Sequence, residues 1–187
     1  MTLGRARTHE QQKQPDETRA SRIVADVDWS MLAGELARLF SRDLDRLLQE
    51  IRAFPDTPSL WTCGPGVTNA AGTLALHLDG NLREFIGRQL GAIAYSRDRP
   101  LEFSARGVER EDLVARLDQL RALIPPVVAG LPDEVLSARY PDDPLAVPMT
   151  TRMFLVHLNG HLNYHLGQID YLRRITTGAG ALPLAGL

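Results

Sequence analysis

The sequence has few of the features that mark several large classes of protein. It has one cysteine, Cys63, among 187 residues, so an intrachain disulfide is impossible and a reducing compartment such as the cytoplasm is favoured. The 21 basic and 23 acidic residues give a net charge of -2, which leaves no cationic surplus for binding nucleic acid or an anionic membrane. Gly, Pro or His interrupts each long uncharged stretch, so no segment is predicted to span a membrane. The 44% hydrophobic and 24% charged residues are typical of a globular protein.

The chain is expected to divide into a tail and one domain. Residues 1–27 are polar and lack the hydrophobic segment of a secretory signal, which predicts a mobile N-terminal tail. Residues 28–187 are predicted to form a single domain. In this part, strand-like alternation is weak, whereas apolar residues recur at three- and four-residue steps in four stretches of roughly twenty residues. The sequence therefore predicts an all-α fold, a four-helix bundle whose connectivity stays open.

Helix-capping residues and prolines set the expected bounds of the four helices. These helices are predicted to cover about residues 29–54, 69–95, 113–131 and 150–175. Ser30 is the expected N-cap of the first helix, and Thr68 or Asn69 that of the second. Pro125 and Pro126 are expected to kink the third helix or end it early, because proline removes a backbone donor and crowds the preceding turn. The segments 96–107 and 132–148 are predicted to be loops.

Three of the five histidines recur at four-residue steps in the last predicted helix: His157, His161 and His165. One step rises about 6 Å, so an adjacent pair can converge on one metal ion but the outer pair, about 12 Å apart, cannot. His77 lies beside Leu74 on the border of the apolar stripe of the second helix and could supply a third ligand. Three imidazoles would leave coordination positions open, which is typical of a metal that binds something else. A set of hydrogen-bonded core histidines is the alternative.

Three segments resemble the signatures of a known family, in the family's order. The run His161-Leu-Asn-Tyr-His165-Leu-Gly-Gln-Ile-Asp-Tyr-Leu-Arg-Arg174 resembles the last-helix signature of the DinB-like (DinB/YfiT) superfamily of metal-binding four-helix bundles. Leu76-His77-Leu-Asp-Gly-Asn81-Leu resembles its second-helix signature, and the segment 95–103 resembles the arm that follows. The resemblance spans about residues 30–177. It implies one divalent metal ion, zinc or nickel, on His77, His161 and His165. It also implies a homodimer and no DNA binding.

The resemblance also implies a choice between two classes of function. Some relatives are thiol-dependent transferases or isomerases, in which the metal binds the sulfur of a low-molecular-weight thiol such as mycothiol or bacillithiol. We therefore expect a metal-dependent thiol S-transferase, or a hydrolase, that acts on a small electrophile. The alternative is a non-enzymatic metal-binding or stress-related interaction module with a structural or vestigial triad. No general acid or base is expected near the triad, because Asp79 and Glu84 point elsewhere by helical periodicity.

Three further residues are candidates for the surroundings of the metal or for a substrate pocket. Asn81 lies one turn beyond His77 and is expected either to orient a bound ligand or to make a buried polar contact between helices. His157 has no counterpart in the family's triad and is expected to lie behind the ligands or in the core. Gln168, three residues after His165, is expected to form a hydrogen bond across the bundle.

Charged and aromatic residues near the predicted site have two interpretations each. Arg97 and Arg99 could bind a carboxylate or phosphate of a substrate at the mouth of the bundle, or pair with neighbouring acidic residues such as Glu102. Arg173 and Arg174 are expected in the last turn of the fourth helix, where their charge complements the helix dipole. Tyr164 and Tyr171, on one face of that helix, are expected to be packing or interface residues.

Glycines recur at a spacing of seven in both site helices: Gly80 and Gly87 in the second, Gly160 and Gly167 in the fourth. Each costs about 1 kcal/mol relative to alanine inside a helix. This cost predicts backbones that approach closely, either between the two helices or across a dimer.

Overall fold

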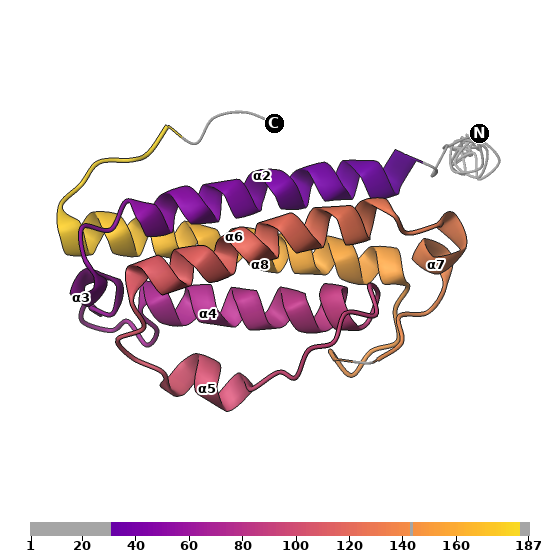
Figure 1. Cartoon of the computed structure of the whole chain (residues 1–187), viewed down its shortest axis with the longest axis horizontal. Coiled ribbons are helices and arrows are strands. Elements are labelled where there is room, and N and C mark those ends of the chain that lie inside the picture. The colour runs from indigo at the N-terminus through magenta and orange to yellow at the C-terminus, as the bar shows by residue number, and fades with distance from the viewer. Residues whose placement is uncertain (1–30, 143, 184–187) are drawn as a thin grey trace, which may run out of the picture.

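Four long helices lie side by side in the protein (Figure 1). The structure is a computed structural model that describes residues 31–142 and 144–183. The long helices are α2 (Leu32–Arg52), α4 (Ala71–Leu82), α6 (Arg110–Ala129) and α8 (Thr151–Thr177). Three short helices join them: α3 (Thr57–Leu60), α5 (Arg99–Ser104) and α7 (Asp133–Ser137). The described residues contain no strand beyond an isolated bridge between Arg139 and Thr150, so the predicted all-α fold is confirmed. The predicted tail, residues 1–27, lies outside the described residues.

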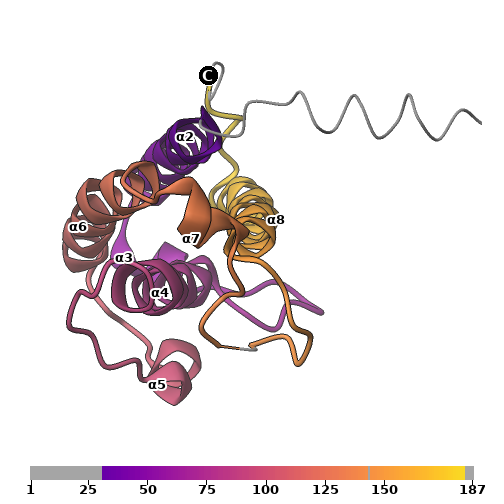
Figure 2. The ribbon, with the colours of Figure 1, turned by 90° about the vertical axis from the view of Figure 1, so that its right-hand side faces the viewer.

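The view along the helices shows how the bundle closes (Figure 2). Helix α2 packs against α6 and α8, and α4 packs against both of these from the opposite side. The α5 arm then covers the outer face of α4. Every residue of α4 is therefore buried, which explains why this helix is apolar on nearly all sides. Polar side chains on α4 are consequently held inside the protein.

The starts of the first two long helices differ from the expected caps. The expected cap Ser30 lies outside the described residues, and the residue before α2 is Met31, which makes no side-chain capping bond. Helix α4 begins after Ala70, so neither Thr68 nor Asn69 is its N-cap. The backbone of Ala70 is extended, and the chain turns into the helix only there. Thr150, by contrast, caps α8 through a hydrogen bond from the Met153 amide.

Helix α4 continues as a π-helix, η2 (Arg83–Arg88), and the helical stretch ends before the expected residue 95. The arm that follows, predicted to be a loop, contains α5. Asp98 accepts a hydrogen bond from the Leu101 amide, and Pro100 occupies the first turn. Both are start signals for a helix, so this part of the loop prediction is wrong. Helix α7 likewise interrupts the second predicted loop.

Helix α6 passes through Pro125 and Pro126 and ends only at Ala129. The expected early end is therefore wrong. The two prolines leave the carbonyls of Arg121 and Ala122 without intrahelical donors, and both of these residues are exposed, so water can satisfy them. Ile124 and Val128 are completely buried on the opposite face, and this packing holds the last turn in the bundle. No helix in the described part of the chain is long and apolar enough to cross a membrane.

Candidate metal centre

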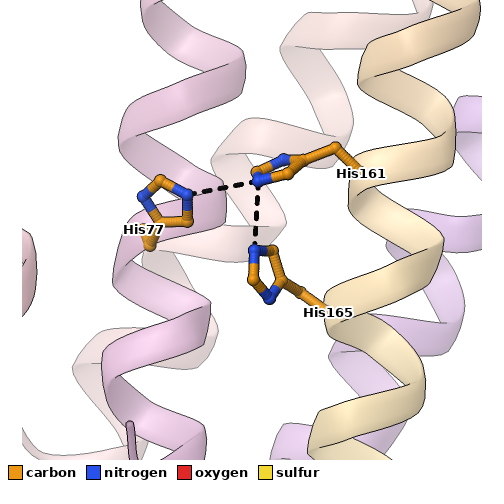
Figure 3. A group of neighbouring side chains, drawn as sticks. All are labelled: His77, His161 and His165. Atoms are coloured by element: carbon orange, nitrogen blue, oxygen red, sulfur yellow. Dashed lines mark hydrogen bonds between the residues drawn. The ribbon is translucent and has the colours of Figure 1, made fainter. Parts of the chain in front are cut away.

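Three imidazole rings from two helices meet inside the bundle (Figure 3). His77 comes from α4, and His161 and His165 come from successive turns of α8. The Nε2 atom of His161 lies 3.3 Å from Nε2 of His77 and 3.0 Å from Nε2 of His165. His77 is buried and the other two rings are half-buried. The fold thus brings together the three histidines named from the sequence, as a group that could hold a metal ion.

The partners of the Nδ1 atoms fix two of the rings. Nδ1 of His77 lies 2.9 Å from Oε2 of Glu102, and Nδ1 of His165 lies 2.7 Å from Oε1 of Gln168. Both oxygens are acceptors, so each ring donates its Nδ1 proton, and the form of the ring that binds a metal keeps a lone pair on Nε2. Both lone pairs point at Nε2 of His161. Because that atom carries at most one proton, it can donate to only one of them.

A divalent cation suits this arrangement better than a shared proton. Nitrogens bound at 2.0–2.1 Å in a tetrahedron are about 3.3–3.4 Å apart, close to the observed separations of 3.3 and 3.0 Å. Nδ1 of His161 is buried and has no hydrogen-bond partner among the described residues. The polar contacts of this ring are therefore those of its Nε2 atom with His77 and His165. Among the described residues the cluster has three imidazoles and no fourth protein ligand, a set that could hold a divalent ion and keep a position for another molecule.

Burial keeps the two α8 histidines neutral. Burial, and after it the neighbouring imidazoles, lowers the pKa of His161 to about 4. Burial also lowers the pKa of His165, in opposition to its hydrogen bond with Gln168. Both rings are therefore unprotonated at neutral pH, which is the form that binds a metal.

A carboxylate that the sequence analysis did not place at the triad lies directly behind His77. Glu102, on α5, is buried, and Arg97 donates to both of its oxygens at 2.7 and 2.8 Å. Burial alone raises the pKa of Glu102, but hydrogen bonds from Arg97 and His77 outweigh it and hold the pKa below its ordinary value. Glu102 is therefore an anion that orients the ring of His77.

Gly80 makes this contact possible. A Cβ atom added to Gly80 would overlap the Glu102 carboxylate, because the α5 arm lies directly on α4 at this point. Gly80 lies one turn of α4 beyond His77. Because it has no side chain, the Glu102 carboxylate on α5 can pass over this turn and reach the ring of His77.

The rotation of α8 about its own axis is set by a buried carboxylate on α2. Asp43 is completely buried and accepts hydrogen bonds from the side-chain amides of Asn159 and Asn163, at 3.1 and 2.7 Å. Arg42 donates to both oxygens of Asp43. With these asparagines turned toward α2, the histidines on either side of Asn163 face α4.

The other three candidates lie at different depths. Asn81 is buried, and its Oδ1 atom has no hydrogen-bond partner. His157 is exposed, stacks on the ring of His161 at a centroid distance of 6.3 Å and lines the cavity beside the triad, so of its two expected places it lies beside a ligand ring and not in the core. Gln168 bonds to His165 within its own helix, so the expected bond across the bundle is also wrong. A spacing of three residues keeps these two side chains on one helical face.

A cavity of about 660 Å³ adjoins the triad. His77, Asn81 and His161 lie on its inner side, and Arg97 and Arg99 also line it. Apolar side chains make up much of the remaining wall: Phe85, Pro144, Leu145, Phe154 and Leu158. Among the described residues, no carboxylate pairs with Arg99, whose guanidinium lies 5.0 Å from the centre of the Phe103 ring. A small molecule can therefore meet two histidines of the triad, His77 and His161, an apolar wall and a cation in one space.

The remaining acidic residues of this region are engaged elsewhere, as expected from periodicity. Asp79 is buried and accepts from Arg83 and Arg116. Glu84 pairs with Arg88 one turn further along. Neither carboxylate contacts the triad. Among the described residues, Glu102 is the carboxylate that bonds to a triad histidine, and Asp142 lines the adjoining cavity.

Of the two arginines expected in the last turn of this helix, Arg174 lies there, whereas Arg173 has another role. The Arg173 side chain is 1% exposed and donates to the buried Glu50 at 2.5 Å, so it ties α8 to α2. A second bond, from Arg173 to the carbonyl of Gly180, holds the segment that follows α8.

The glycine prediction is wrong for contact between the two site helices. A Cβ atom added to Gly160 or Gly167 would meet no described residue within 4 Å, because both glycines face outward from α8. Gly80 meets the α5 arm and not α8. The alternative that the α8 glycines lie against a second copy stays a prediction.

The fold and the histidine cluster define an all-α protein with a possible metal site between two helices of a bundle. Residues 39–169 match the DinB superfamily, and the chain belongs to this family. The resemblance drawn from the sequence is thereby confirmed. No curated protein is significantly similar to the chain.

Solved structures show the same fold. A conserved protein from Enterococcus faecalis is similar with a TM-score of 0.62 and 16% identity, over 78% of this chain and 97% of that one. A DinB-like protein from Bacillus cereus is similar with a TM-score of 0.61 and 15% identity, over 79% of this chain and 95% of that one. At these identities the likeness concerns the fold.

Proposed function

We propose that the protein binds one divalent metal ion, zinc or nickel, through the Nε2 atoms of His77, His161 and His165. The observation that carries this proposal is the convergence of three Nε2 atoms while two Nδ1 atoms are occupied by oxygen acceptors. A fourth ligand would come from a small molecule in the adjoining cavity.

We further propose that this small molecule is a low-molecular-weight thiol, in a thiol S-transfer to a small electrophile in the cytoplasm; hydrolysis, with water in that place, is the related alternative. A bound divalent ion lowers the pKa of a coordinated thiol or water and so supplies a nucleophile at neutral pH. Glu102 and Gln168 hold two ligand rings in the required tautomer. The apolar wall excludes water from the body of the ligand, and Arg99 is placed to pair with a carboxylate on it.

Metal content tests the first part of the proposal. Full-length protein purified without a histidine tag should contain about one zinc or nickel ion per chain by elemental analysis, and His161→Ala should lose it. His157→Ala is the matched control, since His157 lies on the same helix and stacks on His161 but is not part of the cluster. Equal metal content in wild type and His161→Ala would refute the assignment.

Cobalt substitution tests the thiol. The visible absorption of the cobalt protein should shift when mercaptoacetate is added, because sulfur enters the coordination shell. Arg99→Gln should weaken this response more for mercaptoacetate than for the neutral 2-mercaptoethanol. If neither thiol changes the spectrum of the cobalt protein, the proposal of thiol S-transfer is refuted, whereas the proposal of metal binding still stands. Unfolding on chelation would instead support the structural role.

A further inference from the structure

Helix α8 carries an apolar stripe on the face that points away from the bundle. Its large members are 52–70% exposed and follow one another at steps of three, four, seven or eight residues: Met153, Val156, Tyr164, Tyr171 and Ile175. Gly160 and Gly167 fill the gaps on the same face and are exposed as well. These steps keep all seven positions within a band about 100° wide. His157 and Arg174 lie at the two edges of this band, and the seven positions are called the α8 stripe. It runs for about 33 Å along the helix.

The order of large and small residues in the α8 stripe is symmetric about the midpoint between His165 and Leu166. Reversing the helix about that midpoint places Tyr164 on Gly167, Gly160 on Tyr171, and Val156 on Ile175. Two copies of α8 packed antiparallel would therefore set each tyrosine against a glycine of the other copy. A two-fold axis generates this self-matching arrangement.

We propose that the α8 stripe is the contact surface of a homodimer, in which two α8 helices pack antiparallel in the register that seats Tyr164 opposite Gly167. Packing of a large side chain into the hollow at a glycine accounts for both glycines. A Cβ atom on either would meet nothing among residues 31–142 and 144–183, yet each glycine costs the helix about 1 kcal/mol relative to alanine. The proposal does not depend on metal binding.

The available surface is of the right order for a dimer. An aromatic side chain presents roughly 150–250 Å², and if the same range is taken for the other three residues, the five side chains at these exposures leave about 470–780 Å² of mainly apolar surface on each copy. A specific dimer buries about 800 Å² on each partner. The stripe would supply the centre of the interface. Val67, which is exposed and lies with Tyr171 and Ile175 around a second cavity of about 420 Å³, extends it on one side.

Sedimentation equilibrium of the full chain tests the surface. Wild type should be a dimer in the micromolar range, and Gly167→Glu should weaken the dimer at least tenfold, because it sets a charge against the partner copy's tyrosine. The new side chain has room in the single chain and suits a helix better than glycine, so the circular-dichroism melting curve should show an intact fold. Leu101→Glu, at an apolar position of α5 that is 56% exposed, is the matched control and should leave the dimer unchanged.

Two results of that experiment would overturn the proposal. One is a wild-type chain that stays monomeric at every concentration, as expected if residues 1–30 cover the stripe. The other is a Gly167→Glu dimer as tight as wild type.

Cross-linking tests the register. In a Cys63→Ser background, which removes the exposed native thiol, a mixture of Tyr164→Cys and Gly167→Cys chains should form a mixed disulfide under mild oxidation, since the two Cβ atoms must approach to about 4 Å. A mixture of Tyr164→Cys and Gly160→Cys chains is the control and should cross-link far less. Equal cross-linking in the two mixtures would contradict the register.

Discussion

Removing the carboxylate behind His77 should weaken metal binding without removing a ligand. Oε2 of Glu102 accepts the Nδ1 proton of His77 at 2.9 Å, and Arg97 holds the same carboxylate through two hydrogen bonds. Partners of this kind fix the tautomer and raise the basicity of the ligand, and their loss typically lowers metal affinity 10–100-fold. We expect about a tenfold loss for Glu102→Gln, which keeps an acceptor, and about a hundredfold loss for Glu102→Ala.

Competition with a chromophoric chelator measures these affinities. The two losses correspond to about 1.4 and about 2.7 kcal/mol in binding free energy. Glu84→Gln is the matched control. Glu84 lies on η2, the continuation of the helix that carries His77, and it also pairs with an arginine, Arg88, but does not contact the triad. Its affinity should equal that of wild type.

Affinities of both Glu102 variants within twofold of wild type would refute the role given to this residue. A loss of affinity shared with Glu84→Gln would show instead that the variants act through general destabilisation, so the melting temperature of each apo-protein has to be recorded beside its affinity.

Three further predictions concern stability, each measured by urea unfolding. Gly80→Ala should cost about 1–3 kcal/mol, because its Cβ overlaps the carboxylate that packs on α4, whereas Gly34→Ala, with open space around it, should cost nothing; equal effects would contradict the packing argument. Asp43→Ala should cost about 2–4 kcal/mol at pH 7. Burial raises the pKa of Asp43, but hydrogen bonds from Arg42 and from two α8 asparagines outweigh burial and leave the pKa lowered. The stabilisation by Asp43 is therefore complete above the ordinary pKa of an aspartate and is lost as the pH falls through the folded-state pKa. The difference in unfolding free energy between Asp43→Ala and wild type should thus shrink in acid. Arg173→Met should cost about 3–5 kcal/mol by leaving Glu50 buried and unpaired, and adding Glu50→Leu should recover most of this loss; no recovery would contradict the pairing.

Much of the fold could be predicted from periodicity, because burial on one side of a helix leaves a direct trace in the sequence. The apolar residues at three- and four-residue steps in α2 and α6 predicted both of these helices in this way. The ends of helices are less predictable. Ala70 precedes α4 without any capping side chain, and packing of Ile124 and Val128 carries α6 past two prolines. Tertiary contacts, which a single sequence does not display, decide both cases.

The triad could be named because its spacing limits the possible pairs and because family signatures surround it. Glu102 could not, since its approach to His77 depends on how the α5 arm folds back over α4. Two local signals were available. Asp98 and Pro100 mark the start of α5, and Gly80, one turn from His77, marks the point where something packs closely on α4. Together they indicate contact between the arm and the site helix, although they do not identify the contacting side chain.

X-ray absorption of the zinc-loaded, full-length protein tests the central claim most directly, because the scattering pattern of imidazole counts histidine ligands. The proposed centre predicts three imidazole nitrogens at about 2.0–2.1 Å from the zinc, and two in His77→Ala. A spectrum with one imidazole or none, or one that His77→Ala leaves unchanged, would show that the metal binds elsewhere.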